Sequence, residues 1–188
     1  MEQVKIERKI ISQGELDGAC LLYALANSFL SLTGKKPTQS KWDKAIDALP
    51  IKEDFLKGNV GTERYFKENK GENNIRLVSE NFLMGLSKQT KYEFSVMYHN
   101  QITRSDELTP LINKDSVVLF CIDQEHWVVG SSYSADSKIL NIACSFQYIE
   151  NSSYFEKKDS TFERPYNAFT KRANLNCKGT VFSIALKK

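Results

Sequence analysis

Residues 19–33, ACLLYALANSFLSLT, form an almost wholly apolar stretch that constrains the fold more than any other part of the chain. Small residues are interleaved with the larger apolar ones, and no charged residue interrupts them. A helix that is apolar on every side is stable only where other elements cover it. Gly34 and Pro37 follow, and both residue types typically end a helix. The stretch therefore predicts a buried helix that ends near Gly34.

Hydrophobic periodicity divides the rest of the chain into a helical half, at about 1–90, and a sheet half, at about 91–188. In the first half we expect helices near 40–49, 62–69 and 77–88. In the second half we expect a short helix near 106–113 and strands near 92–98, 116–122, 126–133, 137–145 and 180–187. Residues 149–178 fit no regular pattern. Helices followed by antiparallel strands predict an α+β fold, and we expect a single domain over 1–188.

The composition is that of an ordinary globular chain. Its 188 residues are 41% hydrophobic and 26% charged, and no apolar run is long enough to span a bilayer. Residues 1–20 mix charged with apolar residues and lack the apolar core of a Sec signal peptide. We therefore expect a cytoplasmic protein without a signal peptide, or one delivered by a secretion system other than Sec.

Three classes of ligand find no support in the sequence. The formal net charge is only +3, and Lys and Arg are spread along the chain rather than gathered as nucleic-acid binding requires. There is no glycine-rich phosphate loop for a nucleotide. The cysteines, Cys20, Cys121, Cys144 and Cys177, form no CxxC pair and indicate no zinc site. We expect reduced thiols, no cofactor, no metal and no bound nucleic acid; the oligomeric state stays open.

Cys20 stands where a glycine-containing turn, DGAC, enters the apolar helix. We expect Asp17 to cap that helix. The first turn of a helix presents unpaired N–H groups and the positive end of the dipole, which favour a thiolate and can hold an oxyanion. Gln13, a few residues upstream, would supply a second donor to the oxyanion. The alternative is an inert cysteine in the core, because free cysteine is often buried.

The chain has two histidines that could serve such a thiol as a base, His99 and His126. His126 opens a predicted strand in EHWVVG, where the strand and the neighbouring Trp127 would hold the imidazole in place. His99 ends a predicted strand in a polar turn, so we expect it in solvent. We therefore pair Cys20 with His126 as nucleophile and base. The alternative for His126 is a surface histidine at a strand start.

These pieces resemble the papain-like cysteine hydrolases. Members of that superfamily place a Gln upstream of a Cys at the start of the central helix, then a His on a strand of a twisted antiparallel sheet, then an Asn or Asp on the next strand. The matching residues here are Gln13-Gly14, Gly18-Ala19-Cys20 and His126-Trp127-Val128-Val129-Gly130. DGACLLYAL is also similar to the cysteine motif of OTU-type deubiquitinases, and SVVLFCIDQEHWVVG to OspI-type glutamine deamidase effectors. The resemblance implies a papain-like fold, with the nucleophile at a helix start packed on the sheet.

The residue that orients the histidine, the third member of a papain-like site, is the one that the sequence determines least. A hairpin that turns near 134–136 would bring positions 141–144 opposite His126. Asn141 is the usual orienting residue type in that stretch, and papain-like enzymes can use Asn. The Asp of the deamidase pattern, however, falls at Ala143, on the same strand face. Either Asn141 takes the role from two residues away or the position is empty. Two turn residues are further alternatives, Asp123 and Asp136.

The sequence and the resemblance together predict a thiol-dependent amide hydrolase that acts on a protein. Cys20 would attack the carbonyl carbon, and His126 would move the proton. Gln13 and the Cys20 N–H would hold the oxyanion, and Asn141 would orient the imidazole. Peptide or isopeptide cleavage ranks first, on a ubiquitin-like or host protein. One alternative is an effector or toxin that deamidates glutamine with the same residues. The other is a binding or inhibitory module on a papain-like scaffold.

Overall fold

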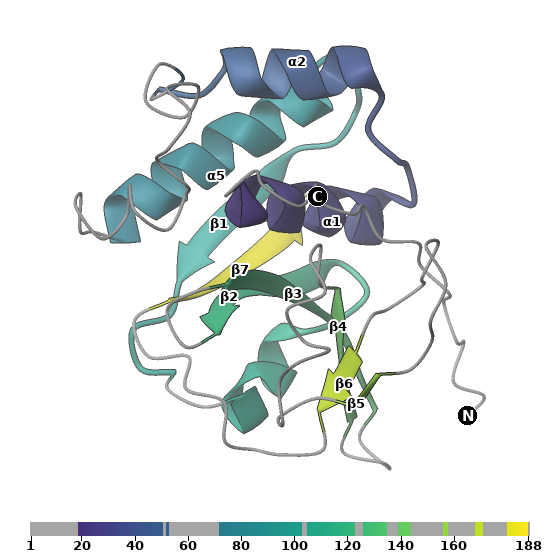
Figure 1. Cartoon of the computed structure of the whole chain (residues 1–188), viewed down its shortest axis with the longest axis vertical. Helices are drawn as coiled ribbons and strands as arrows, with labels where there is room; N and C mark the ends of the chain where they lie inside the picture. Colours follow the sequence, from purple (N-terminus) through teal and green to yellow (C-terminus); the bar gives the residue numbers. More distant parts are fainter. Residues whose placement is uncertain are drawn as a thin grey trace.

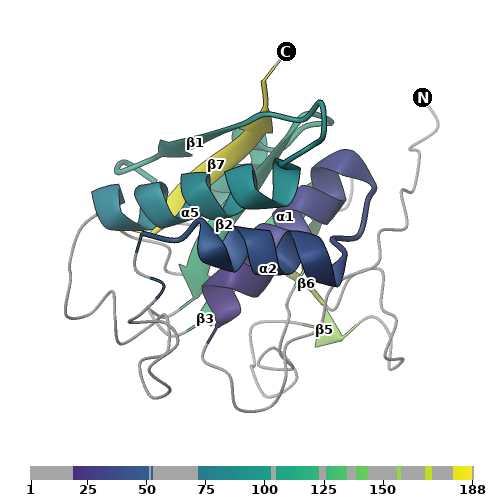
Figure 2. The same ribbon diagram turned by 90° about the horizontal axis from the view of Figure 1, so that it is seen from above.

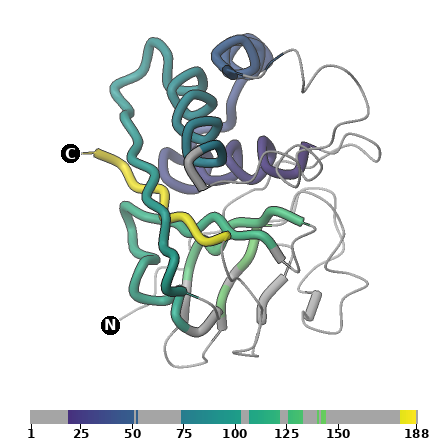
Figure 3. Tube along the Cα trace, turned by 90° about the vertical axis from the view of Figure 1, so that its left-hand side faces the viewer, coloured from purple at the N-terminus to yellow at the C-terminus, as the bar shows by residue number. Residues whose placement is uncertain are grey.

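The chain folds into two main layers, a group of helices and an antiparallel sheet (Figure 1, Figure 3). The computed structural model describes residues 19–50, 52, 72–102, 105–122, 126–134, 139–143, 156–157, 168–170 and 180–187. Three α-helices among the described residues precede the strands; two of them, α1 and α5, cover one face of the sheet, and α2 packs against α5. The predicted α+β fold is confirmed. None of the described helices has the length and hydrophobicity that crossing a bilayer requires.

Helix α1, Cys20–Thr33, is the apolar stretch, and all of its residues except Tyr23 and Thr33 are buried. It ends as predicted at Gly34, whose φ of 69° is left-handed and whose N–H donates to the Leu30 carbonyl at 2.8 Å. Ala19, rather than the expected Asp17, occupies the N-cap position, and its own side chain makes no capping hydrogen bond. The Asp17 side chain lies outside the described residues.

Two further helices belong to the described part of this layer, α2 at Gln39–Asp47 and α5 at Glu72–Ser87. The Thr38 side chain accepts from the Lys41 N–H and starts α2. Trp42 of α2 joins the three helices, because its ring lies 5.0 Å from Tyr23 of α1 and 5.4 Å from Phe82 of α5, centroid to centroid. Both helices were predicted near these positions; the helix expected at 62–69 lies outside the described residues.

The sheet has the strand order β1-β7-β2-β3-β4-β6-β5, with every neighbouring pair antiparallel. Its main strands are β1 Phe94–Tyr98, β2 Ser116–Ile122, β3 His126–Ser134, β4 Ile139–Ala143 and β7 Val181–Leu186. Two short strands, β5 Glu156–Lys157 and β6 Ala168–Thr170, come from the segment that showed no pattern in the sequence. The last strand, β7, lies between β1 and β2, so the end of the chain holds the sheet together (Figure 2).

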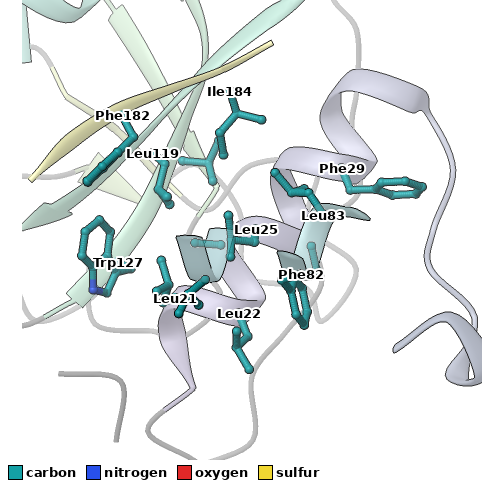
Figure 4. Close-up of a cluster of buried hydrophobic side chains, with 14 of the residues drawn as sticks. Leu21, Leu22, Leu25, Phe29, Phe82, Leu83, Leu119, Trp127, Phe182 and Ile184 are labelled. Carbon is teal, nitrogen blue, oxygen red and sulfur yellow. The ribbon is translucent and has the colours of Figure 1, made fainter. Parts of the chain in front are cut away.

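Apolar side chains cover both faces of the sheet. Leu119, Phe182 and Ile184 face the helices and pack in one cluster with Phe29 and Phe82 (Figure 4). The other face packs against the 3₁₀ helix η1, Ser105–Leu111, which was predicted as a short helix. Each fully buried Leu or Phe contributes roughly 1.5–3 kcal/mol. Successive side chains of a strand belong alternately to the two clusters, and this alternation determines which side chains face α1.

Helices α2 and α5 approach each other closely at Gly85. A Cβ atom added at Gly85 would lie 2.4 Å from the Ala45 Cα, which is far inside normal contact. The two small residues therefore set the spacing of the helices that cover α1.

Gly85→Ala should destabilise the protein, although alanine is normally about 1 kcal/mol better than glycine inside a helix. The clash is with backbone, which cannot move aside as a flexible side chain would. We expect a loss of about 2 kcal/mol or more in the free energy of unfolding, measured by urea denaturation. Asn81→Ala, one turn earlier on α5, is the control and should change stability by less than about 0.5 kcal/mol. A Gly85→Ala variant as stable as the wild type would contradict this packing.

Candidate active site

Cys20 is the first residue of α1 and is only 5% exposed. The N–H groups of a helix's first turn have no partner within the helix, and the dipole is positive there. No acidic side chain lies in this first turn to oppose a negative charge. The thiol therefore stands where an anion, either a thiolate or an oxyanion, is stabilised by the backbone.

His126 is the first residue of β3 and is also 5% exposed. It pairs with Ile122 of β2, which fixes its backbone in the sheet. Burial lowers the pKa of His126 from 6.5 to about 4, because a charged imidazole loses its hydration there. The ring is therefore neutral at pH 7, the form that can accept a proton from a thiol.

The structure brings the starts of α1 and β3 to the same region of the helix–sheet interface. Cys20 and Leu21 belong to the same buried cluster as Trp127, the residue after His126. Figure 4 shows Leu21 on the side of α1 that faces Trp127. Side chains alternate along β3, however: Trp127 faces the helices and Val128 faces the other cluster. The same alternation would direct His126, like Val128, away from the helices. Its ring can reach Cys20 only if the first residue of the strand departs from this alternation.

His99 lies elsewhere in the fold. It was expected in solvent, but it is half-buried, and its Nε2 lies 2.8 Å from the Ser183 Oγ. Burial lowers the pKa of His99 as well. Ser183 stands between Phe182 and Ile184, which both face the helices, so alternation directs Ser183 and its His99 partner to the opposite face from Cys20.

The predicted register of the β3–β4 hairpin is wrong. Asn141 pairs with Ser132 and Ala143 with Val129, with a bulge between Gly130 and Ser132. Ser132 is far from His126, since six residues of strand span about 20 Å. The orienting role of Asn141 was predicted from a register that placed it opposite His126, and the observed register does not support it.

Ala143 is the residue at which the resemblance to the deamidase effectors would place the orienting Asp. It is buried in the cluster that faces α1, opposite Val129. Its methyl group cannot accept a hydrogen bond from an imidazole. A site built on Cys20 and His126 would therefore lack an orienting residue at this position.

The structure describes some of the other residues that the sequence singled out, but not all of them. Cys121 is a free, buried cysteine as expected, and it stands directly opposite Trp127 in the register of β2 and β3. Cys121 belongs to the same buried cluster as Cys20, which hydrophobic periodicity in the sequence could not have predicted. Several predicted positions lie outside the described residues: Gln13, Asp17, Asp123, Asp136, Cys144 and Cys177. Within the described part of the chain, no three His, Cys, Asp or Glu residues gather as metal ligands would.

The sequence matches none of the known protein-family models, and no curated protein matches it either. The resemblance to papain-like hydrolases therefore rests on the sequence motifs alone.

The low pKa of His126 predicts an acid-sensitive fold. The unfolded chain takes up a proton on this residue below about pH 6.5, whereas the folded chain does so only below about pH 4. Stability should therefore fall as the pH drops from 6.5 to 4, with His126 accounting for up to about 3 kcal/mol. Urea denaturation of His126→Gln across this range should show a flatter pH dependence than the wild type.

His99→Gln is the matched control for this measurement. His99 is less buried than His126, so its removal should leave most of the pH dependence in place. If His126→Gln keeps the slope of the wild type, the imidazole is not buried as described.

Proposed function

We propose that this chain is a thiol-dependent amide hydrolase of the papain-like type that acts on a protein substrate. The supporting observation is that a buried thiol at the start of α1 and a buried, neutral imidazole at the start of β3 belong to two elements of the same helix–sheet interface. The two elements pack against each other, and the neighbouring residues Leu21 and Trp127 share one cluster. A thiol and a neutral imidazole are the two groups that nucleophilic catalysis by a cysteine requires.

The proposed reaction proceeds through a thioester. His126 takes the proton of the Cys20 thiol as the sulfur attacks the carbonyl carbon of the amide. Backbone N–H groups at the start of α1 hold the oxyanion, with Gln13 as a further donor on the sequence evidence. The imidazolium then protonates the leaving amine, and the C–N bond breaks. Water, deprotonated by His126, attacks the thioester and releases the acid and the free thiol.

Burial has two consequences for this chemistry. It keeps His126 neutral at pH 7, so the ring is ready to accept the thiol proton. It also makes the imidazolium costly, and the alanine at position 143 offers no acceptor to stabilise that charge.

Glutamine deamidation is the second candidate, and the low exposure of both residues favours it. Cys20 and His126 are each 5% exposed, which suits the entry of one narrow side chain better than the passage of a polypeptide. The chemistry is the same until the leaving group departs, which is then ammonia, and hydrolysis of the thioester leaves a glutamate side chain.

Cys20 should react with iodoacetamide much faster than Cys121. The two cysteines have nearly the same exposure, 5% and 4%, so a difference in rate would reflect reactivity rather than access. We expect at least about a tenfold faster modification of Cys20, followed by mass spectrometry of the intact, folded chain. His126→Ala should remove most of that difference, because the base is lost.

Substrate assays then separate the two enzymatic candidates. Labelling of Cys20 by a ubiquitin-type electrophilic probe would support isopeptide cleavage, and ammonia release from glutamine-containing proteins would support deamidation. Cys20→Ala is the control in both assays. Equal modification rates for Cys20 and Cys121, with no turnover of any amide, would reject the enzyme and favour the binding module.

A further inference from the structure

Strand β1 forms a free edge of the sheet, because β7 is its one neighbour among the described strands. The Lys187 N–H donates to the Glu93 carbonyl, and the His99 N–H to the Val181 carbonyl, both at 2.9 Å. Hydrogen-bonded pairs alternate along an antiparallel ladder, so Ser95 and Met97 point their backbone groups to β7. The residues whose N–H and C=O groups then point outward are Phe94, Val96 and Tyr98.

Within the described residues, this edge lacks three of the devices that usually prevent pairing: a charged residue, a proline and a bulge. Its sequence, FSVMY, has no charged residue and no proline, and its register with β7 runs without a bulge. Natural sheets normally protect an exposed edge with one of these features. The outward N–H and C=O groups therefore favour a partner that is itself an extended strand.

Exposed apolar side chains lie on both sides of the same edge, on β1 and on α5. Among the described residues, the large hydrophobic side chains that are exposed are Leu77, Met84 and Met97, at 47%, 61% and 61%. Met97 lies on β1, and the other two lie seven residues apart on α5, on one side of the helix. Figure 2 shows α5 running alongside β1. Met97 follows the buried Val96, so it points to the face away from the helices, whereas Leu77 and Met84 flank the edge on the helical side.

A pocket of about 970 Å³ lies between α2, α5 and β1. Its apolar lining includes Met84, Tyr92, Phe94 and Val96. Its charged lining residues are balanced: Lys44, Lys88 and Lys187 against Asp47, Glu80 and Glu93. Such a surface does not select a strongly acidic or basic partner, but it is electrostatically compatible with a second copy of itself. Neither Cys20 nor His126 lines it.

We propose that β1 pairs antiparallel with β1 of a second copy of this chain, about a two-fold axis at Val96. Such an axis gives an isologous contact, in which the same surface meets itself. Val96 lies opposite its own copy, Phe94 lies opposite Tyr98, and Ser95 lies opposite Met97. The outward N–H and C=O groups of the edge are then all paired. This assembly does not depend on the proposed hydrolase activity.

The flanking residues and helices complete the contact. In this register Glu93 of one copy lies opposite His99 of the other, which brings an acceptor to an imidazole. Pairing of one short strand buries little area, and stable interfaces bury about 1,200–2,000 Å². Because a two-fold axis normal to the sheet keeps both helical layers on one face, α5 packs against its copy and supplies the additional area. Met84 and Leu77 lie on the exposed side of α5 that this contact covers.

Sedimentation velocity of the full chain over a wide concentration range should show a species of twice the mass of one chain. Hydrogen exchange should slow with concentration at the amides of Phe94, Val96 and Tyr98. The amides of Ser95 and Met97, already bonded to β7, are the internal control and should not change.

Met97→Lys should weaken the dimer at least about tenfold, because it places like charges diagonally across the axis. Met97 is 61% exposed, so the fold should be retained, as a thermal melt would verify. Met97→Glu should weaken the dimer similarly, and mixing the two variants should restore association. Gln39→Lys, which adds a charge on an exposed part of α2, is the control and should dimerise normally.

Three results would overturn this proposal. One is a wild-type chain that remains monomeric at every concentration. Another is a dimer that Met97→Lys leaves unchanged. The third is protection of the outward amides that is the same at all concentrations, which would mean that another part of the same chain covers the edge.

Discussion

Burial of α1 on both sides is the constraint on which the rest of the structure depends. The helix packs against α5 on one side and against β2, β3 and β7 on the other, and its side chains Leu21, Leu25 and Phe29 are fully buried. Even its polar residues fit this environment, since the Ser28 Oγ donates to the Ala24 carbonyl at 3.0 Å. Because this hydroxyl is hydrogen-bonded within the helix, it needs no polar partner among the surrounding apolar side chains. The position of Cys20 at one end of α1 is therefore fixed by the packing of the leucines that follow it.

The same burial sets the character of the candidate site. Cys20 is held by the helix and His126 by the register of β2 with β3, so neither backbone is free to move far. Rigidity of this kind favours catalysis by keeping reacting groups oriented. The disadvantage of burial is dehydration, which depresses the pKa of His126 and opposes the imidazolium that the proposed reaction needs. Ala143, packed on the α1 face, adds nothing polar to offset that cost.

Local patterns predicted the elements well but not how they pair. The apolar stretch of α1, its end at Gly34 and the β-branched run of β2 are readable because periodicity and turn residues act locally. The partner of His126 was not readable, because β3 extends to Ser134 and β4 begins only at Ile139. When the centre of a hairpin moves by one residue, the partner of every strand residue changes by two positions. A small error in the predicted turn is therefore enough to move Asn141 away from the position opposite His126. The insertion of β7 between β1 and β2 is a non-local contact that no local pattern contains.

That insertion also separates the two proposed roles of the sheet. In the strand order, β7 and β2 lie between β1 and β3, and neighbouring strands are about 4.8 Å apart. The start of β3 is therefore about 14 Å across the sheet from the free edge. A second copy paired at β1 would extend the sheet away from β3, because β1 has its free side opposite β7. Pairing at the edge would thus leave the approach to Cys20 and His126 unblocked by the paired strands, and loss of one property would not by itself remove the other.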